Sequence, residues 1–185
     1  MVVAVKKDVG FVVGVTGCDI MGDMSNRDLA LEENVPFWKV KGAKDCYVVA
    51  NDVGLGVDLL RYSDYIFKDV TDGKSVVEEV IPKMKGLLGK YGQVFNGKEW
   101  SGQLLIIKGE KMFLISPFFT VTEMEDAAAL GQDTYVLGAL REGCNLSAEE
   151  KVIFAMRTVE QMRGRKLFPM VLFDTKTKKR KVRSA

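Results

Sequence analysis

Residues 1–16 read MVVAVKKDVGFVVGVT, two apolar runs on either side of a short charged stretch. The runs Val2–Val5 and Phe11–Val15 are rich in β-branched residues, which favour extended strands. The charged stretch between them ends at Gly10, and a polar segment closed by glycine is typical of a tight turn. The stretch therefore predicts a β-hairpin at the head of the chain.

The same signals continue along the rest of the chain. Further strands are predicted at Phe37–Val40, at Cys46–Asn51, in a hairpin over residues 103–117 closed by Gly109 and Glu110, and in a last hairpin around Thr175–Lys178. Helices are predicted at residues 53–68, 76–91 and 134–141, and from the capping box of Ser147 and Glu150 to Met162. Residues 19–34 are polar and irregular and are expected to form a loop. The order of strands, two helices, strands, two helices and strands predicts a single α+β domain over residues 1–185, with antiparallel sheets and helices outside them.

Composition narrows the possible functions. The 185 residues are 47% hydrophobic, which is enough for a sizeable core, and the net charge of +2 argues against broad capture of nucleic acid. The chain has no histidine, so Ser-His and Cys-His triads and most catalytic zinc sites are excluded, and neither a metal nor a cofactor is expected.

The three cysteines form no evident disulfide framework, and the apolar runs are too short to span a bilayer. With no recognisable leader, these features predict a cytoplasmic protein.

Four stretches together resemble the proteasome β-type branch of the N-terminal-nucleophile hydrolases. They are VVAVKKDVGFVV (2–13), WKVKGAKDCYVVANDVGLGVDLL (38–60), DAAALGQDTYVLGALREG (126–143) and NLSAEEKVIFAMRTVEQM (145–162). The resemblance implies a four-layer αββα sandwich and subunits that stack into rings. It also implies an AAA unfoldase or other proteasome-like subunits as partners, and no membrane partner.

The family's catalytic positions can be carried over one at a time. Its nucleophile is a terminal threonine at the head of the first strand, and the alignment puts Met1 one place inside that position. Its first-hairpin aspartate falls at Thr16, and its lysine matches Lys39. The later positions fall at Gln132 and Asp133, where the family has a serine and a glycine, and near Gln161, where it has an aspartate. Of the catalytic residues, only Lys39 is retained.

A terminal threonine is a nucleophile because its hydroxyl and its own α-amine form a compact nucleophile–base pair, whose proton transfer a lysine tunes. A methionine offers the amine without the hydroxyl. The sequence therefore predicts a catalytically inactive proteasome-like subunit in a self-assembled structural or regulatory ring. A first alternative is a threonine-type endopeptidase whose native nucleophile is absent from this chain. A second is a small-ligand-binding module that uses the vacated cleft around Met1, Thr16 and Lys39.

Several other features have a functional and a structural interpretation. Cys18 follows Gly17, and cleavage between them would expose a terminal thiol, although a free cysteine just past a strand is more often a core residue.

The carboxylates of residues 19–33 fit no calcium loop and are expected to be solvated. The resemblance implies that the stretch VPFW (35–38), with the aromatic residues Phe37 and Trp38, lies at a subunit interface. The basic run TKTKKRKVRSA (175–185) is interpreted as an edge strand rather than a nucleic-acid site.

Overall fold

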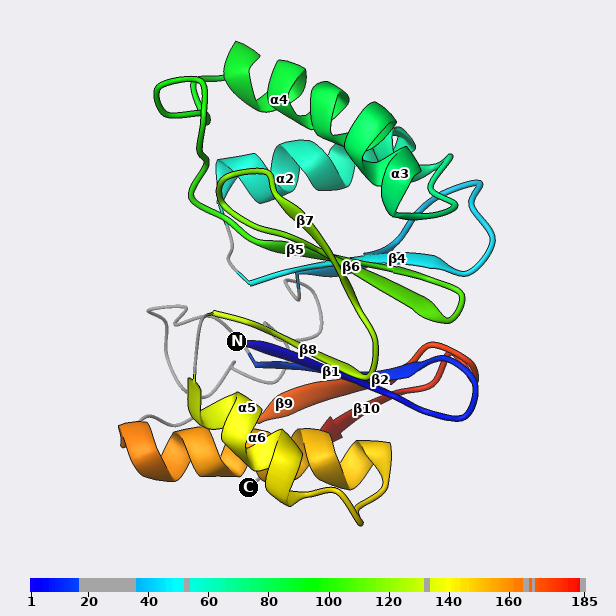
Figure 1. Ribbon diagram of the computed structural model, residues 1–185, viewed down its shortest axis with the longest axis vertical. Coiled ribbons are helices and arrows are strands. Elements are labelled where there is room, and N and C mark those ends of the chain that lie inside the picture. The colour runs from blue at the N-terminus through cyan, green and yellow to red at the C-terminus, as the bar shows by residue number, and fades with distance from the viewer. Residues whose placement is uncertain (17–35, 52–53, 132–133, 165–166, 168, 184–185) are drawn as a thin grey trace. The chain divides into compact units, whose positions relative to one another are not determined.

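The computed structural model describes residues 1–16, 36–51, 54–131, 134–164, 167 and 169–183 (Figure 1). The chain divides into two compact units. The first, the terminal unit, comprises Met1–Val35 and Asp126–Ala185, and the second, the central unit, comprises Pro36–Glu125. Each unit consists of one antiparallel sheet with helices, so the predicted α+β class is confirmed.

The sheet of the terminal unit has the strand order β10-β9-β2-β1-β8, and every neighbouring pair is antiparallel. Its strands are β1 (Val2–Lys6), β2 (Phe11–Thr16), β8 (Ala127–Leu130), β9 (Met170–Asp174) and β10 (Arg180–Arg183). The predicted first hairpin is present, with Val2 opposite Val15 and Lys6 opposite Phe11. The predicted last hairpin pairs β9 with β10, which lies at an edge of the sheet and is exposed along its length.

Gly10 closes the β1–β2 turn for two reasons. Its φ of +81° lies in the left-handed region that favours glycine, and a Cβ at this position would lie 2.7 Å from Oγ1 of Thr175. That Oγ1 atom accepts a hydrogen bond of 2.8 Å from the backbone N–H of Phe11. The absence of a side chain at Gly10 thus lets the β9–β10 turn dock against the first hairpin.

Two helices cover one face of this sheet (Figure 1). They are α5 (Thr134–Glu142) and α6 (Ala148–Arg163), and α6 begins at the predicted capping box of Ser147 and Glu150. The core between the helices and the sheet includes Val3, Val5, Val152, Met156 and Met170.

The sheet of the central unit has the strand order β3-β4-β5-β6-β7, again antiparallel throughout. Its strands are β3 (Phe37–Lys39), β4 (Cys46–Ala50), β5 (Leu104–Lys108), β6 (Lys111–Ile115) and β7 (Val121–Met124). Gly109 and Glu110 close the β5–β6 hairpin as predicted. Trp38 is 7% exposed and packs edge-on against Phe67 in the core. The expectation that Trp38 lies at a subunit interface is therefore wrong.

Helices cover one face of this sheet as well (Figure 1). The helix predicted over residues 53–68 ends early, as α2 (Leu55–Tyr62) followed by a 3-10 turn, η2 (Asp64–Phe67). The helix predicted over residues 76–91 is longer, and runs through α3 (Gly73–Ser75), a π-helical segment, η3 (Val76–Val80), and α4 (Ile81–Lys90). Pro82 has no N–H to donate to the preceding turn, and the wider π-helical turn directly before α4 accommodates it. Within the described residues, no helix has the length and apolar character needed to cross a membrane.

Candidate functional site

Met1 and Thr16 meet where β1 begins and β2 ends. The terminal amine of Met1 donates a hydrogen bond of 2.9 Å to Oγ1 of Thr16, and the backbone N–H of Thr16 donates one of 3.0 Å to the Met1 carbonyl. Thr16 is only 2% exposed. Two of the positions that the sequence singled out are therefore in direct contact.

This pair lacks two groups that the threonine-protease mechanism needs. The Met1 side chain carries no hydroxyl or thiol, so its α-amine has no nucleophile of its own to activate. Thr16 is neutral, so it cannot hold a lysine by charge as the family's aspartate does. Its hydroxyl instead accepts the hydrogen bond of the Met1 amine. This bond gives the buried hydroxyl the partner that a buried polar group needs.

Lys39 belongs to the central unit, where it is exposed at the end of β3. Its cross-strand neighbour is Tyr47, which stacks on Phe37 with ring centroids 5.7 Å apart. Among the residues that the structure describes, no carboxylate forms an ion pair with Lys39. Within the central unit, Lys39 therefore lies at the end of an edge strand with no ion-pairing carboxylate among the described residues.

The remaining sequence candidates divide into two groups. Cys18, Gln132, Asp133 and the carboxylates of residues 19–33 lie outside the described residues. Gln161 is described and lies exposed near the C-terminal end of α6. No cluster of residues suited to holding a metal ion occurs within the described part of the chain.

Cys46 is the one cysteine whose chemistry the structure defines in detail. It is fully buried at the start of β4, and its Sγ lies 3.8 Å from the carbonyl oxygen of Phe67. Burial raises the pKa of the Cys46 thiol to about 11, and the nearby charge of Lys108 opposes this only in part. Because the thiolate is the reactive form, Cys46 is a core residue and not a nucleophile.

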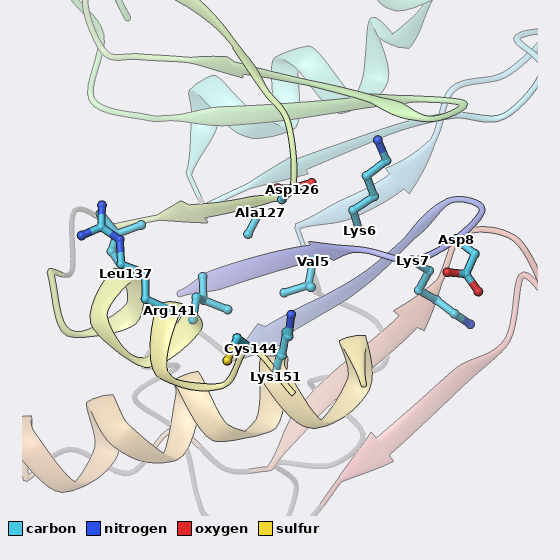
Figure 2. A pocket seen from close by; sticks show the side chains of 11 residues that line it. Val5, Lys6, Lys7, Asp8, Asp126, Ala127, Leu137, Arg141, Cys144 and Lys151 are labelled. Atoms are coloured by element: carbon cyan, nitrogen blue, oxygen red, sulfur yellow. The ribbon is translucent and has the colours of Figure 1, made fainter. Parts of the chain in front are cut away.

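A pocket of about 570 Å³ lies within the terminal unit, at the end of the sheet where the β1–β2 turn lies (Figure 2). Its lining comes from separate stretches of the chain: residues 5–8 of the first hairpin, residues 126–127 at the start of β8, α5 with the turn after it, and Lys151 on α6. A volume of this size is within the range of small-molecule sites. This pocket could not be predicted from the sequence, because no local motif marks residues that only the fold brings together.

The polar groups around the pocket are mainly cationic. Four lysine or arginine side chains line it together with two carboxylates: Lys6, Lys7, Arg141 and Lys151, with Asp8 and Asp126. Figure 2 shows Lys151 extending from α6 toward Val5 on β1. The thiol-bearing residue Cys144, on the turn after α5, is exposed and also lines the pocket.

Comparison with known proteins identifies the fold and no more than the fold. No protein-family model matches the chain, and no curated protein matches it. Solved structures do match: two antiparallel sheets with helices in this order occur in a bacterial protein over almost the whole length of both chains.

That protein is BPH of Thiobacillus denitrificans. The structure of BPH in complex with epoxomicin matches with a TM-score of 0.68 and 18% sequence identity, covering 94% of this chain and 96% of BPH. A second BPH structure matches with a TM-score of 0.66 and 19% identity over the same shares. The two proteins therefore share a fold, at a level of sequence identity that says nothing by itself about activity.

Proposed function

We propose that this chain is a proteasome-like subunit of the N-terminal-nucleophile fold, with the four-layer αββα arrangement, that self-assembles into a structural or regulatory ring and does not hydrolyse peptides. The proposal is supported by the fold shared with BPH over nearly all of both chains and by the four stretches that resemble the proteasome β-type family. It includes a cytoplasmic location and, as partners, further copies of this chain, other proteasome-like subunits or an AAA unfoldase.

Thr16 is the residue on which the inactive assignment rests. It is buried opposite the head of β1, at the position of the family's aspartate, and its hydroxyl already accepts the hydrogen bond of the Met1 amine. In the family that the chain resembles, the aspartate at this position is an electrostatic partner of the lysine that Lys39 matches, and a neutral threonine cannot take that role. The proton transfer that activates a threonine nucleophile would therefore lack support even if a hydroxyl were supplied.

Native mass spectrometry of the purified protein tests the assembly, because one spectrum gives both the subunit mass and the assembly mass. We expect a closed oligomer whose subunits have the mass of the chain from Met1 or Val2. Incubation with epoxomicin, the molecule in the BPH complex, is expected to leave the subunit mass unchanged. A monomer would contradict the ring, and a monomer that retains a co-purified small molecule would favour a binding module.

Hydrolysis of short fluorogenic peptides tests the absence of activity. We expect no turnover above that of a heat-denatured sample. If turnover occurs, Lys39→Ala is compared with Lys41→Ala, a neighbouring exposed lysine whose side chain has no place in the family's mechanism. Activity that is lost in Lys39→Ala and kept in Lys41→Ala would establish the threonine-type peptidase instead. Subunits shortened to begin at Cys18 would point to self-processing.

A further inference from the structure

The pocket of the terminal unit has two chemically different walls. The wall formed by the sheet carries Lys6 and Lys7 together with Asp8 and Asp126, so its charges balance. The wall formed by the helices carries Arg141 and Lys151, and none of its described lining residues is a carboxylate. The positive charge of the pocket is therefore concentrated on the helical wall.

The cations of the helical wall are available to a ligand. Neither Arg141 nor Lys151 forms an ion pair within the part of the chain that the structure describes. The two carboxylates nearest to Lys151 in sequence are engaged elsewhere. Glu149 binds Lys181 and Arg183, at 3.0 and 2.6 Å, and Glu150 accepts from Ser147 in the capping box.

Lys7, by contrast, is already paired. Its Nζ lies 2.7 Å from Oδ2 of Asp174, which is not part of the pocket lining. With Lys7 neutralised in this way, the sheet wall offers no net positive charge. An anionic group would be drawn to the helical wall, and above all to Lys151, which forms no ion pair with any residue that the structure describes.

Apolar side chains accompany these cations. Val5 and Ala127 from the sheet, and Leu137 and Leu140 from α5, line the same pocket. A ligand that fills the pocket would thus cover apolar surface with one part and meet the ammonium of Lys151 with another. This combination suits a molecule with one anionic group on an apolar body, and disfavours a free inorganic ion, which would leave the apolar surface uncovered.

We propose that this pocket is a binding site for a small amphipathic anion, a carboxylate or phosphate group on an apolar body. Lys151, whose side chain extends toward Val5, holds the anionic group, and Val5, Ala127 and Leu140 contact the apolar part. The guanidinium of Arg141 extends beside Leu137, away from Lys151, and adds positive charge to the same wall (Figure 2). The site lies wholly within the terminal unit, and it does not depend on whether the chain hydrolyses peptides or forms a ring.

Cys144 in the pocket lining provides a chemical probe of the site. Iodoacetate and iodoacetamide alkylate a thiolate by the same step, in which the sulfur–carbon bond forms and iodide leaves, but only iodoacetate carries a negative charge. The two rates at Cys144 are followed by mass spectrometry of the peptide that contains it. Because the reactivity of the thiol affects both rates equally, their ratio reports the electrostatic potential at Cys144. Relative to the same ratio for β-mercaptoethanol, we expect an increase of about fourfold or more, which is the effect of one cation about 5 Å away in a water-like dielectric.

Substitution shows which cations are responsible. Lys151→Met and Arg141→Met each remove a charge while keeping an aliphatic stem. Lys151→Met is expected to reduce the rate ratio toward that of β-mercaptoethanol, and Arg141→Met to reduce it less, because its guanidinium extends away from Lys151 (Figure 2). Lys98→Met, at an exposed lysine of the central unit, is the matched control and should leave the ratio unchanged. An increase that is equal in all three variants would overturn the role given to Lys151.

Protection of Cys144 tests for binding itself in the unaltered protein. Octanoate and octyl phosphate are added as probes, with 1-octanol and inorganic phosphate as partial molecules, and alkylation by the neutral reagent iodoacetamide is followed. We expect saturable protection by octanoate, octyl phosphate or both, and which of them protects identifies the anionic group. Equal protection by 1-octanol would mean that the site binds apolar molecules without regard to charge. Protection by phosphate alone would mean that it binds inorganic ions, and no protection would mean that the positive charge near Cys144 binds no ligand. Each of these three results overturns the proposal.

Discussion

At the scale of single residues, the contact of Gly14 with α6 limits what β2 can carry. A Cβ at Gly14 would lie 2.4 Å from Cγ1 of Val152, which is fully buried on the sheet-facing side of α6. Val152 is β-branched and has few alternative rotamers in a helix, so it cannot easily turn away. The close approach of α6 to the sheet therefore requires glycine at this position.

Gly14→Ala is expected to lower the free energy of unfolding by about 1–3 kcal/mol, because α6 must shift or Val152 must leave its preferred rotamer. Urea denaturation of the two proteins measures this difference. The matched control is Gly86→Ala in α4, where a Cβ would meet no atom within 4 Å. That variant is expected to raise the free energy of unfolding by about 0.5–1 kcal/mol, since alanine favours a helix interior. Two changes of the same sign would contradict the packing argument.

The sequence could predict part of the candidate site at this scale. The resemblance singled out Met1 and Thr16, and the hairpin, which fixes the residues that face each other, brings these two into contact. A cleft that also includes Lys39 stays a prediction. The pocket could not be predicted, because Val5, Ala127, Arg141, Cys144 and Lys151 meet only through the pairing of β1 with β8 and the packing of α6.

At the scale of elements, predictions succeeded where the signal is local. The β1–β2 and β5–β6 hairpins carry their turn residues with them, and α6 carries its own capping box. Strand β7 was not predicted, because Val121–Met124 has no apolar alternation and pairs only with β6 at the edge of the sheet. The early end of α2 was also missed, because the apolar residues of η2 continue the helical spacing beyond Tyr62.

The capping box makes the start of α6 testable. Oγ of Ser147 accepts from the N–H of Glu150, while Oε2 of Glu150 accepts from the N–H of Ser147 at 2.9 Å. Ser147→Ala removes one half of this exchange and is expected to lower the free energy of unfolding by about 1 kcal/mol. Ser147→Asn is the control, since asparagine also caps a helix and should lose only a few tenths of that. Thermal unfolding followed by circular dichroism measures both, and equal losses would show that the hydroxyl is not the cap.

At the scale of the whole molecule, several carboxylates link folding to pH. Hydrogen bonds lower the pKa of Asp72, in the central unit, and of Glu150, while Arg183 and then Lys181 lower the pKa of Glu149. Burial alone would raise the pKa of Asp174, but Lys7 and the N–H groups of the β9–β10 turn together lower it.

A carboxyl with a lowered pKa stabilises the fold above its unfolded pKa, and this contribution is lost as the pH falls through the folded pKa. We therefore expect stability to fall once the pH drops below roughly 4.5, the ordinary range of these groups.

The Lys7–Asp174 pair allows this linkage to be measured at one contact that joins the first and last hairpins. Asp174→Asn removes the charge and leaves an oxygen for the N–H groups of Lys176 and Thr177, which Asp174 holds at 3.0 and 2.9 Å. Lys7→Met keeps the stem without the ammonium. The two side chains are 37% and 20% exposed, so a double-mutant cycle should give a coupling of only about 0.5–1 kcal/mol at pH 7.

The same cycle at about pH 2 provides the decisive comparison. Protonation of Asp174 removes one charge of the pair, so the coupling free energy should fall toward zero while the hydrogen bonds of the β9–β10 turn are weakened in the parent and in Lys7→Met alike. Asp174→Asn should accordingly lose less stability than the parent between pH 5 and pH 2, as measured by urea denaturation at each pH. A coupling that persists unchanged in acid would show that Lys7 and Asp174 interact through packing of their side chains, and that their charges do not hold the two hairpins together.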